Sequence, residues 1–319
     1  MTETAMLADY ILPASSQYEK YEATFFPHEF PENFFHLRKP MIEPKPGTLA
    51  EPEMHARLVE ELGVFEDGEL TTLSDAASYG LDTFSVAMQE AMLSNPKIAH
   101  YLPYVLYRTL GPSLPDGAAA AAGLWGLCSR LAVSNPEAVR AAGHEGEGMS
   151  LGNNLFQSIL NSPSGLIILK LAVGDASQWR HANRKINLLM GEMSDEIDYL
   201  KQFKLPERTD EFPLVLSAGE RRLYTANTVV RDPDWMKSNN PASLFVHPSD
   251  AAKLGIEEAG RANLVTKRGK AQVLVELDDR LQEGSIALPN GLGLVYPNAK
   301  GENEQFGVAP NELTDLDDR

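Results

Sequence analysis

The hydrophobic pattern of this chain changes its period near residue 205. Between residues 74 and 203, apolar side chains recur at the three- and four-residue spacing of helices. After residue 205, short runs of alternating apolar and polar residues are separated by glycine and proline, which is typical of strands. Because such a change predicts a domain boundary, we expect three parts: residues 1–73, a helical insert at 74–204 and a mostly β domain at 205–319.

Composition limits the kinds of partner that the chain can bind. It has 319 residues with 45 acidic and 28 basic side chains, which gives a net charge of −17. A surface this acidic repels nucleic acid and anionic lipid. The longest apolar run, Gly165–Val173, is interrupted by Lys170 and has about half the length of a membrane span. We therefore expect neither nucleic-acid binding nor a membrane span and, with no signal-peptide pattern at the N-terminus, a cytoplasmic location.

The first 73 residues read like the middle of a domain. Tyr10–Leu12 predicts a buried strand, which needs sheet neighbours on both sides. Residues 17–49 are rich in aromatic residues and proline without a period, and they predict a long ordered loop. Pro52–Gly63 predicts a helix that ends at Gly63 and packs through one apolar face, made of Met54, Leu58, Val59 and Leu62.

The helical part predicts a packed core rather than a ligand site. Four large apolar residues recur at helical spacing, namely Leu81, Phe84, Met88 and Met92. Asn135 before Pro136 predicts the start of another helix, which Gly143 ends. Cys128, the single cysteine, excludes an internal disulfide and a cysteine-based metal site made by this chain alone. Because it lies in an alanine-rich helix, we interpret it as a core residue.

The C-terminal part predicts short strands, one helix and a tight turn at Arg268–Gly269. The helix is expected at Ser249–Leu254, and Gly255 ends it. The strands are expected at 214–217, 225–230, 243–247, 262–267, 271–277 and 285–288. Many short strands with frequent turns favour a closed barrel over a sandwich.

Three consecutive segments of this β domain resemble a known family. Pro241–Ile256, Val265–Val273 and Glu283–Pro289 are similar to the molybdopterin-dinucleotide-binding domain of molybdenum oxidoreductases of the dimethyl sulfoxide reductase and formate dehydrogenase type. The resemblance covers residues 210–319. Near the other end of the chain, Thr4–Glu19 resembles the stretch that precedes this domain in the same family.

The resemblance implies a mixed fold and a cofactor. It implies a partial α/β segment that embraces the cofactor at 1–73, the helical insert at 74–204, and a double-psi β-barrel like that of aspartate decarboxylase at 205–319. The cofactor is bis-molybdopterin guanine dinucleotide with molybdenum or tungsten. In the family, the segment matching Ser217–Thr228 wraps the cofactor, and the asparagine of an Asn-x-Leu-Thr motif, here Asn311–Thr314, contacts the pterin.

The residue types in these segments suit a pyrophosphate-linked dinucleotide. A glycine allows close approach of the backbone, guanidinium groups bind phosphate oxygens, and amides match the edges of pterin and guanine. The candidate cofactor-binding residues are Gly219, Arg221, Arg222, Asn227, Thr228 and Asn311. Taken without the resemblance, the two arginines are equally ordinary as solvated charges at a strand edge.

The resemblance also implies what this chain lacks. The metal ligand and any iron–sulfur cluster of the family belong to regions upstream of the matched segments. We therefore expect the chain to be the C-terminal part of a molybdopterin-dependent oxidoreductase, inactive alone, with upstream domains of the same enzyme and electron-transfer subunits as partners. No catalytic residue and no metal ligand is assigned within it, and His247, which precedes Pro248 at a strand end, is interpreted as structural.

Two other functions stay open at this point. A double-psi barrel also serves as a binding or adaptor module without a redox cofactor. Alternatively, the chain is a complete enzyme of the aspartate decarboxylase type, which cleaves itself at a Gly-Ser pair to form a pyruvoyl group. Gly284–Ser285 is the candidate for that cleavage.

Overall fold

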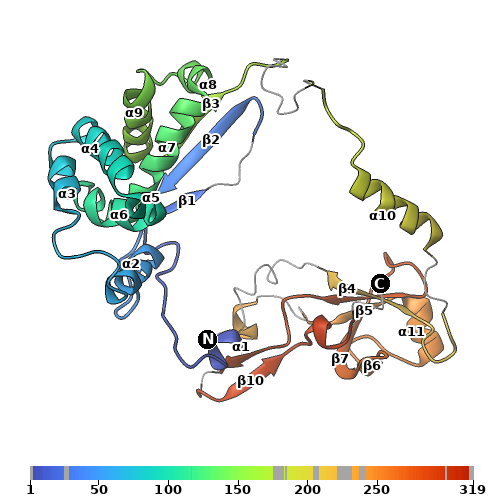
Figure 1. The fold of residues 1–319 in the computed structure, drawn as a ribbon. Helices are drawn as coiled ribbons and strands as arrows, with labels where there is room; N and C mark the ends of the chain where they lie inside the picture. Colours follow the sequence, from blue (N-terminus) through green and yellow to red (C-terminus); the bar gives the residue numbers. More distant parts are fainter. Residues whose placement is uncertain are drawn as a thin grey trace. The chain divides into compact units, whose positions relative to one another are not determined.

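The structure is a computed structural model that describes residues 3–24, 29–115, 117–174, 183, 185–203, 208–220, 232–236, 242–298 and 300–315. Contacts divide the chain into two compact units (Figure 1). One unit is residues 12–187, and the other is residues 188–319 together with 1–11. The predicted division after residues 73 and 204 stays a prediction. None of the helices within the described ranges combines the length and the hydropathy that crossing a membrane requires.

The unit of residues 12–187 packs helices against a small antiparallel sheet. Its strands are β1 (Glu22–Thr24), β2 (Glu32–Arg38) and β3 (Leu166–Lys170), in the order β1-β2-β3. Its helices are α2 (Glu51–Glu61), α3 (Thr71–Ser78), α4 (Leu81–Ser94), α5 (Pro96–His100), α6 (Leu102–Thr109), α7 (Ala122–Ser134), α8 (Pro136–Ala141) and α9 (Gly148–Asn161), with short 3₁₀ turns η1 (Gly111–Ser113) and η2 (Ala118–Ala121). Helix α9 contacts both β2 and β3, so the sheet and the helices share one core.

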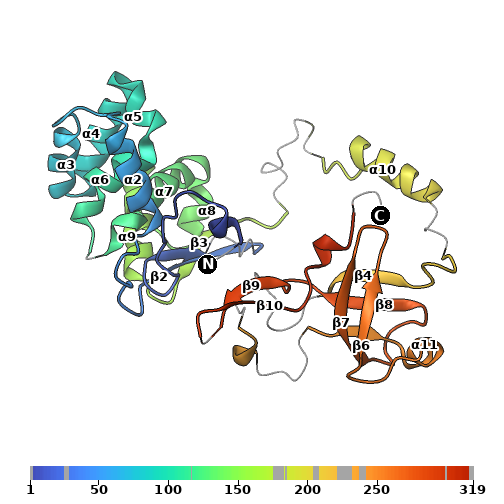
Figure 2. The ribbon, with the colours of Figure 1, turned by 90° about the horizontal axis from the view of Figure 1, so that it is seen from below.

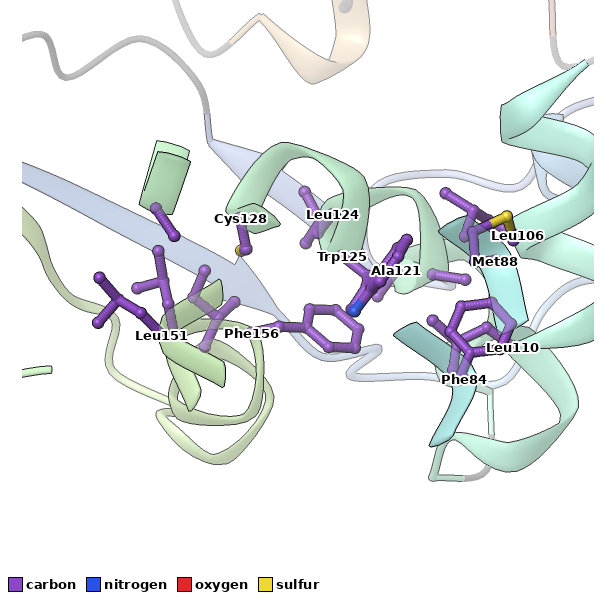
Figure 3. Close-up of a cluster of buried hydrophobic side chains, with 14 of the residues drawn as sticks. Phe84, Met88, Leu106, Leu110, Ala121, Leu124, Trp125, Cys128, Leu151 and Phe156 are labelled. Atoms are coloured by element: carbon purple, nitrogen blue, oxygen red, sulfur yellow. The ribbon is translucent and has the colours of Figure 1, made fainter. Parts of the chain in front are cut away.

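The core of this unit confirms the predicted apolar stripe. Phe84 and Met88 are fully buried, and Phe84 packs edge to face on Trp125 with ring centroids 5.1 Å apart (Figure 3). Cys128 lies in the same cluster (Figure 3), and burial raises the pKa of its thiol to about 12. Because the thiolate is the reactive form, this cysteine is chemically inert at neutral pH.

A buried amide joins three helices inside this core. The Oδ1 atom of Asn153 accepts hydrogen bonds from Trp125 Nε1 at 2.8 Å and from Ser85 Oγ at 3.1 Å. Its Nδ2 donates to Asp82 Oδ1 at 2.8 Å. Since a buried polar group without partners costs free energy, these bonds fix the register of α4, α7 and α9.

Helix α2 forms where it was predicted, but the predicted buried face is wrong. Ala56 is fully buried, whereas Leu58 is 50% and Leu62 77% exposed. The helix packs on α6 through polar groups instead. Glu53 accepts hydrogen bonds from Tyr107 Oη at 2.9 Å and from Arg108 Nη1 at 2.8 Å. Packing through charged partners removes the apolar signal on which the prediction relied.

Three other expectations for the first two parts of the chain are also wrong. Tyr10 and Leu12 do not form a buried strand but are 91% and 61% exposed, because no described strand pairs with this segment. Residues 17–49 are not a continuous loop, since they contain β1 and β2. The helical stretch is interrupted by β3, which pairs with β2 from far along the chain.

The second unit contains a five-stranded mixed sheet in the order β4-β8-β5-β7-β6 (Figure 2). These strands are β4 (Val215–Glu220), β5 (Leu244–Val246), β6 (Arg261–Val265), β7 (Lys270–Leu277) and β8 (Ser285–Pro289). A separate hairpin is made of β9 (Leu294–Pro297) and β10 (Asn303–Phe306). The helical segments are α1 (Glu3–Met6), α10 (Gly191–Gln202), α11 (Pro248–Leu254), η5 (Pro233–Trp235) and η6 (Pro310–Glu312).

The sequence predictions for this unit are largely confirmed. Five of the six expected strands are present, α11 ends at Gly255 in the left-handed conformation, and the turn at Arg268–Gly269 joins β6 to β7. The sixth strand, expected at 225–230, lies outside the described residues. The hairpin of β9 and β10 was not predicted. The mixed fold is confirmed, but the expected closed barrel is not, because β4 and β6 are at opposite edges of an open sheet in the described part of the chain.

Candidate cofactor site

A cavity of ≈ 1200 Å³ opens along the five-stranded sheet. Its apolar wall includes Leu216 on β4, Val246 on β5 and Leu264 on β6. Its polar wall carries three cationic side chains and one amide, which are Arg208, Lys267, Arg268 and Asn311. The cavity therefore combines an apolar strand face with groups that bind anions and ring edges.

Gly219 lies at an irregularity of β4. The parallel pairing of β4 with β8 shifts register between Ala218 and Glu220, so Gly219 occupies a β-bulge. Its φ of 118° is in the region that favours glycine, and no atom lies within 4 Å of the place where a Cβ would stand. Ala218 beside it lines the cavity. The backbone is consequently open to close approach at the position that the sequence proposed for it.

Asn311 is on η6, and its exposed side chain lines the same cavity as Ala218. The turn between β6 and β7 holds the segment that carries it. Thr266 Oγ1 donates to the carbonyl of Leu313 at 2.7 Å, and Arg268 Nη1 donates to that of Thr314 at 2.6 Å. With Leu313 buried, the Asn-x-Leu-Thr segment is fixed to the sheet while the amide stays accessible.

The structure brings together only two of the six candidate residues. Gly219 and Asn311 border one cavity through Ala218 and Asn311 itself. The other four candidates, Arg221, Arg222, Asn227 and Thr228, lie outside the described residues. Their role in cofactor binding stays a prediction.

Two cationic residues of the cavity were not predicted to be functional. Arg208 comes before the first predicted strand, and Arg268 was interpreted only as part of a turn. The available signal was the resemblance of Val265–Val273, which contains Arg268. Both guanidinium groups are of the type that binds phosphate oxygens.

His247 has a structural role in the described part of the chain. Its Nδ1 accepts a hydrogen bond from the backbone N–H of Ser249 at 3.2 Å and so caps α11. The described residues contain no group of three or more histidine, cysteine or acidic side chains that could hold a metal ion. The interpretation of His247 as structural is therefore supported by its contact.

Asp250 on α11 fixes the start of β8. It is buried, accepts a hydrogen bond from the backbone N–H of Gly284 and pairs with Lys253 at 3.2 Å. The Gly284 N–H, outweighing partial desolvation and aided by Lys253, holds the pKa of Asp250 below its ordinary value. Gly284 has a φ of 78°, so the proposed self-cleavage pair Gly284–Ser285 is an ordered strand entry here, and its cleavage stays a prediction.

The residues around the cavity fit a phosphate-linked pterin dinucleotide. A glycine bulge with no atom in front of it allows a phosphate to approach the backbone. Guanidinium groups at Arg208 and Arg268 supply charge, and the exposed amide of Asn311 supplies a donor and an acceptor. The described residues supply no candidate set of metal ligands, so a metal at this site would need its ligands from the cofactor or from other protein regions.

Comparisons with known proteins agree with this site. Residues 214–319 match the family model described as "Molydopterin dinucleotide binding domain". Acetylene hydratase from Syntrophotalea acetylenica is 22% identical over 296 residues, which are 91% of this chain and 32% of that protein. A tetrathionate reductase from Archaeoglobus fulgidus is 37% identical over 60 residues of its matching polypeptide, which are 18% of this chain and 5% of that protein.

Among solved structures, acetylene hydratase from Pelobacter acetylenicus is 19% identical with a TM-score of 0.41, covering 91% of this chain and 32% of that one. The chain thus spans about a third of the length of the acetylene hydratase that it matches. The family match covers β4 to η6, the strands and turn that border the cavity with Gly219 and Asn311. The C-terminal region of this chain, residues 214–319, therefore belongs to the molybdopterin-dinucleotide-binding domain family.

Proposed function

We propose that the C-terminal unit holds one half of a bis-molybdopterin guanine dinucleotide that carries molybdenum or tungsten. The observation that carries this proposal is the shared cavity, which the bulge strand at Gly219 and the amide of Asn311 both border within the matched domain. The open backbone at Gly219 receives a phosphate, and Asn311 hydrogen-bonds to a ring edge. Arg221 and Arg222 follow the bulge directly, so they are the nearest cations along the chain to that phosphate.

The apolar wall of the cavity supports a second part of the proposal. The exposed strand face needs an apolar cover, and residues 225–230 have the alternating β-branched pattern to provide it. We infer that this segment closes the sheet into the double-psi β-barrel of the aspartate decarboxylase type. Closure covers Leu216, Val246 and Leu264 and leaves the polar rim for the cofactor.

The chain is proposed to be the C-terminal part of a longer enzyme and to be inactive alone. When bound, the metal–dithiolene group supplies two-electron chemistry with transfer of an oxygen atom or a hydride equivalent. This chain's own residues bind and orient the dinucleotide, while upstream domains supply the metal ligand and any iron–sulfur cluster. Electron-transfer subunits are the proposed partners, and the cytoplasm is the proposed compartment.

The reaction class has two candidates. We propose an oxidoreductase, which the similarity to a tetrathionate reductase supports. The longer alignment is with an acetylene hydratase, and that name denotes addition of water. Assays of the longest reading frame with reduced and oxidised dyes, and with acetylene, separate the two reactions.

The phosphate role is tested by removing charge at two positions. We expect the double variant Arg221→Gln, Arg222→Gln of the chain expressed with any upstream part of its reading frame to retain at least about tenfold less pterin. This corresponds to about 1.4 kcal/mol or more of lost binding free energy. The measurement is pterin and metal content per protein. A matched control removes two charges elsewhere, with Arg140→Gln and Lys201→Gln, both of which form surface ion pairs.

Equal pterin retention in the double variant and its control would show that the arginine assignment is wrong. Absence of molybdenum, tungsten and pterin from the unaltered protein would favour an adaptor module without a redox cofactor. An intact mass that reveals cleavage between Gly284 and Ser285 would favour the pyruvoyl enzyme.

A further inference from the structure

Asn290 has a buried polar atom without a partner at the end of β8. Its Oδ1 is buried and accepts no hydrogen bond in the described part of the chain. An unpaired buried acceptor is unfavourable and rare in folded proteins, so it calls for an explanation. A ligand that donates an N–H group to this oxygen is one such explanation.

Sheet register places Asn290 beside the glycine bulge of β4. Strands β4 and β8 are parallel neighbours, with Ala218 opposite Leu288 and Glu220 opposite Pro289. Asn290 follows Pro289 directly, so it lies at the same carboxyl end of the strand pair as Gly219. In open sheets, ligands bind outside the carboxyl ends of parallel strands.

Packing then links Asn290 to the segment that carries Asn311. The chain after Asn290 turns through Gly291 and Gly293, which have φ values of 74° and 80°. A Cβ on Gly293 would collide with the backbone of Ala309, so this loop packs directly on the residues that precede η6. The backbone N–H of Gly293 also donates to the carbonyl of Phe306 at 2.7 Å. The glycines thus hold the loop of Asn290 between the bulge and η6.

We propose that Asn290 recognises the 2-amino-4-oxo ring edge that pterin and guanine share. This edge presents adjacent N–H donors beside a carbonyl oxygen. A side-chain amide complements it, because Oδ1 accepts from the ring N–H and Nδ2 donates to the carbonyl. The inference rests on the proposed dinucleotide function and adds a specificity-determining residue to it.

The test compares two ring sources on the 319-residue chain. Guanosine monophosphate is titrated by calorimetry, with adenosine monophosphate as a control that carries the same phosphate without this edge. 6-Hydroxymethylpterin is titrated by its fluorescence. Binding of guanosine monophosphate alone assigns Asn290 to the guanine end, and binding of the pterin alone assigns it to the pterin end; both results support the proposal when the variants below behave as expected.

The decisive variant is Asn290→Leu, which removes the acceptor with little change in volume. We expect the Kd for the bound probe to rise about tenfold, as for lost ring hydrogen bonds, while the thermal midpoint stays equal or rises because no buried acceptor is left unpaired. Asn290→Asp keeps an oxygen at this place and is expected to bind the ring N–H groups within about threefold of the unaltered chain. Asn161→Ala, at an exposed asparagine of the other unit, is the matched control and should change neither value.

Two results separate this inference from the function on which it rests. If the unaltered chain binds a probe and Asn290→Leu binds it equally, the role of Asn290 is wrong while the proposed function stands. If the unaltered chain binds neither probe, the proposed function fails in this chain. A lower thermal midpoint for Asn290→Leu with an unchanged Kd for Asn290→Asp and Asn290→Leu would assign Asn290 a structural role and overturn the inference.

Discussion

The two compact units differ in how their apolar surfaces are covered. In residues 12–187, the largest side chains of the core are fully buried, Phe84, Met88 and Phe156 among them. In the C-terminal unit, the five-stranded sheet is lined on one side by a cavity of ≈ 1200 Å³ that Leu216 and Ile286 border. The helical unit thus buries its apolar side chains among its own described residues, whereas the sheet presents a strand face to a cavity.

This difference indicates what each unit is built to do. A unit whose core is closed gains most of its stability from burial. A sheet that borders a cavity with cations and an amide on its rim gains part of its stability from whatever fills that cavity. The comparison therefore predicts that truncation of a core residue has a large effect in the first unit and a small one at the cavity.

The largest expected effect is that of Phe156→Ala. This side chain is fully buried, and we expect the substitution to lower the free energy of unfolding of the helical unit by about 3–5 kcal/mol. Leu216→Ala, at a half-buried position on the cavity wall, should cost only about 1 kcal/mol. The measurement is denaturant unfolding of the whole chain followed by fluorescence and circular dichroism. Equal losses at the two positions would contradict the comparison.

The next effect concerns the acid stability of the helical unit. Partial burial tends to raise the pKa of Glu53, but hydrogen bonds from Arg57, Arg108 and Tyr107 outweigh it and lower that pKa from its ordinary value of 4.5 to about 2. Because the pKa is lower in the folded state, this stabilisation is present above about pH 4.5 and is lost as the pH falls toward 2. We expect Glu53→Gln to lower the free energy of unfolding by about 2 kcal/mol at pH 7 and to flatten its pH dependence between about pH 4.5 and 2.

The control for Glu53 is Glu137→Gln. Glu137 also pairs with an arginine, Arg140, but its side chain is 87% exposed, so we expect a change below about 0.5 kcal/mol. Unfolding at several pH values, measured for both variants, checks the prediction. An acid-unfolding curve for Glu53→Gln that superimposes on that of the unaltered chain would exclude the network as a source of stability.

How well the sequence predicted the fold depended on where each element finds its partners. Helix α11 and the turn at Arg268–Gly269 carry their own caps and turn residues, so local pattern was sufficient. Strand β2 was missed because its partner β3 comes after the whole helical part, and pairing over that distance leaves no local signal. The buried face of α2 was assigned wrongly because its contact with α6 is an ionic network centred on Glu53.

For the candidate site, residues whose role is set by the backbone were easier to find than those set by contacts. Gly219 and Asn311 were found because a glycine before a basic pair and an Asn-x-Leu-Thr motif are visible in the sequence. Arg208 and Asn290 have no such signal, since their importance comes from a cavity wall and from an unpaired buried atom. Both depend on packing between segments that are distant in the chain.

The smallest expected effect tests the structural role of His247 in the C-terminal unit. His247→Ala removes the acceptor for the Ser249 N–H at the start of α11 and should lower the free energy of unfolding by about 1 kcal/mol. His247→Asn restores a capping oxygen, so its thermal midpoint should return close to that of the unaltered chain. Pterin and metal content should be equal in both variants. If His247→Asn instead recovers stability but loses metal as completely as His247→Ala, the imidazole is a ligand, and the C-terminal unit contributes to the metal site as well as to the dinucleotide.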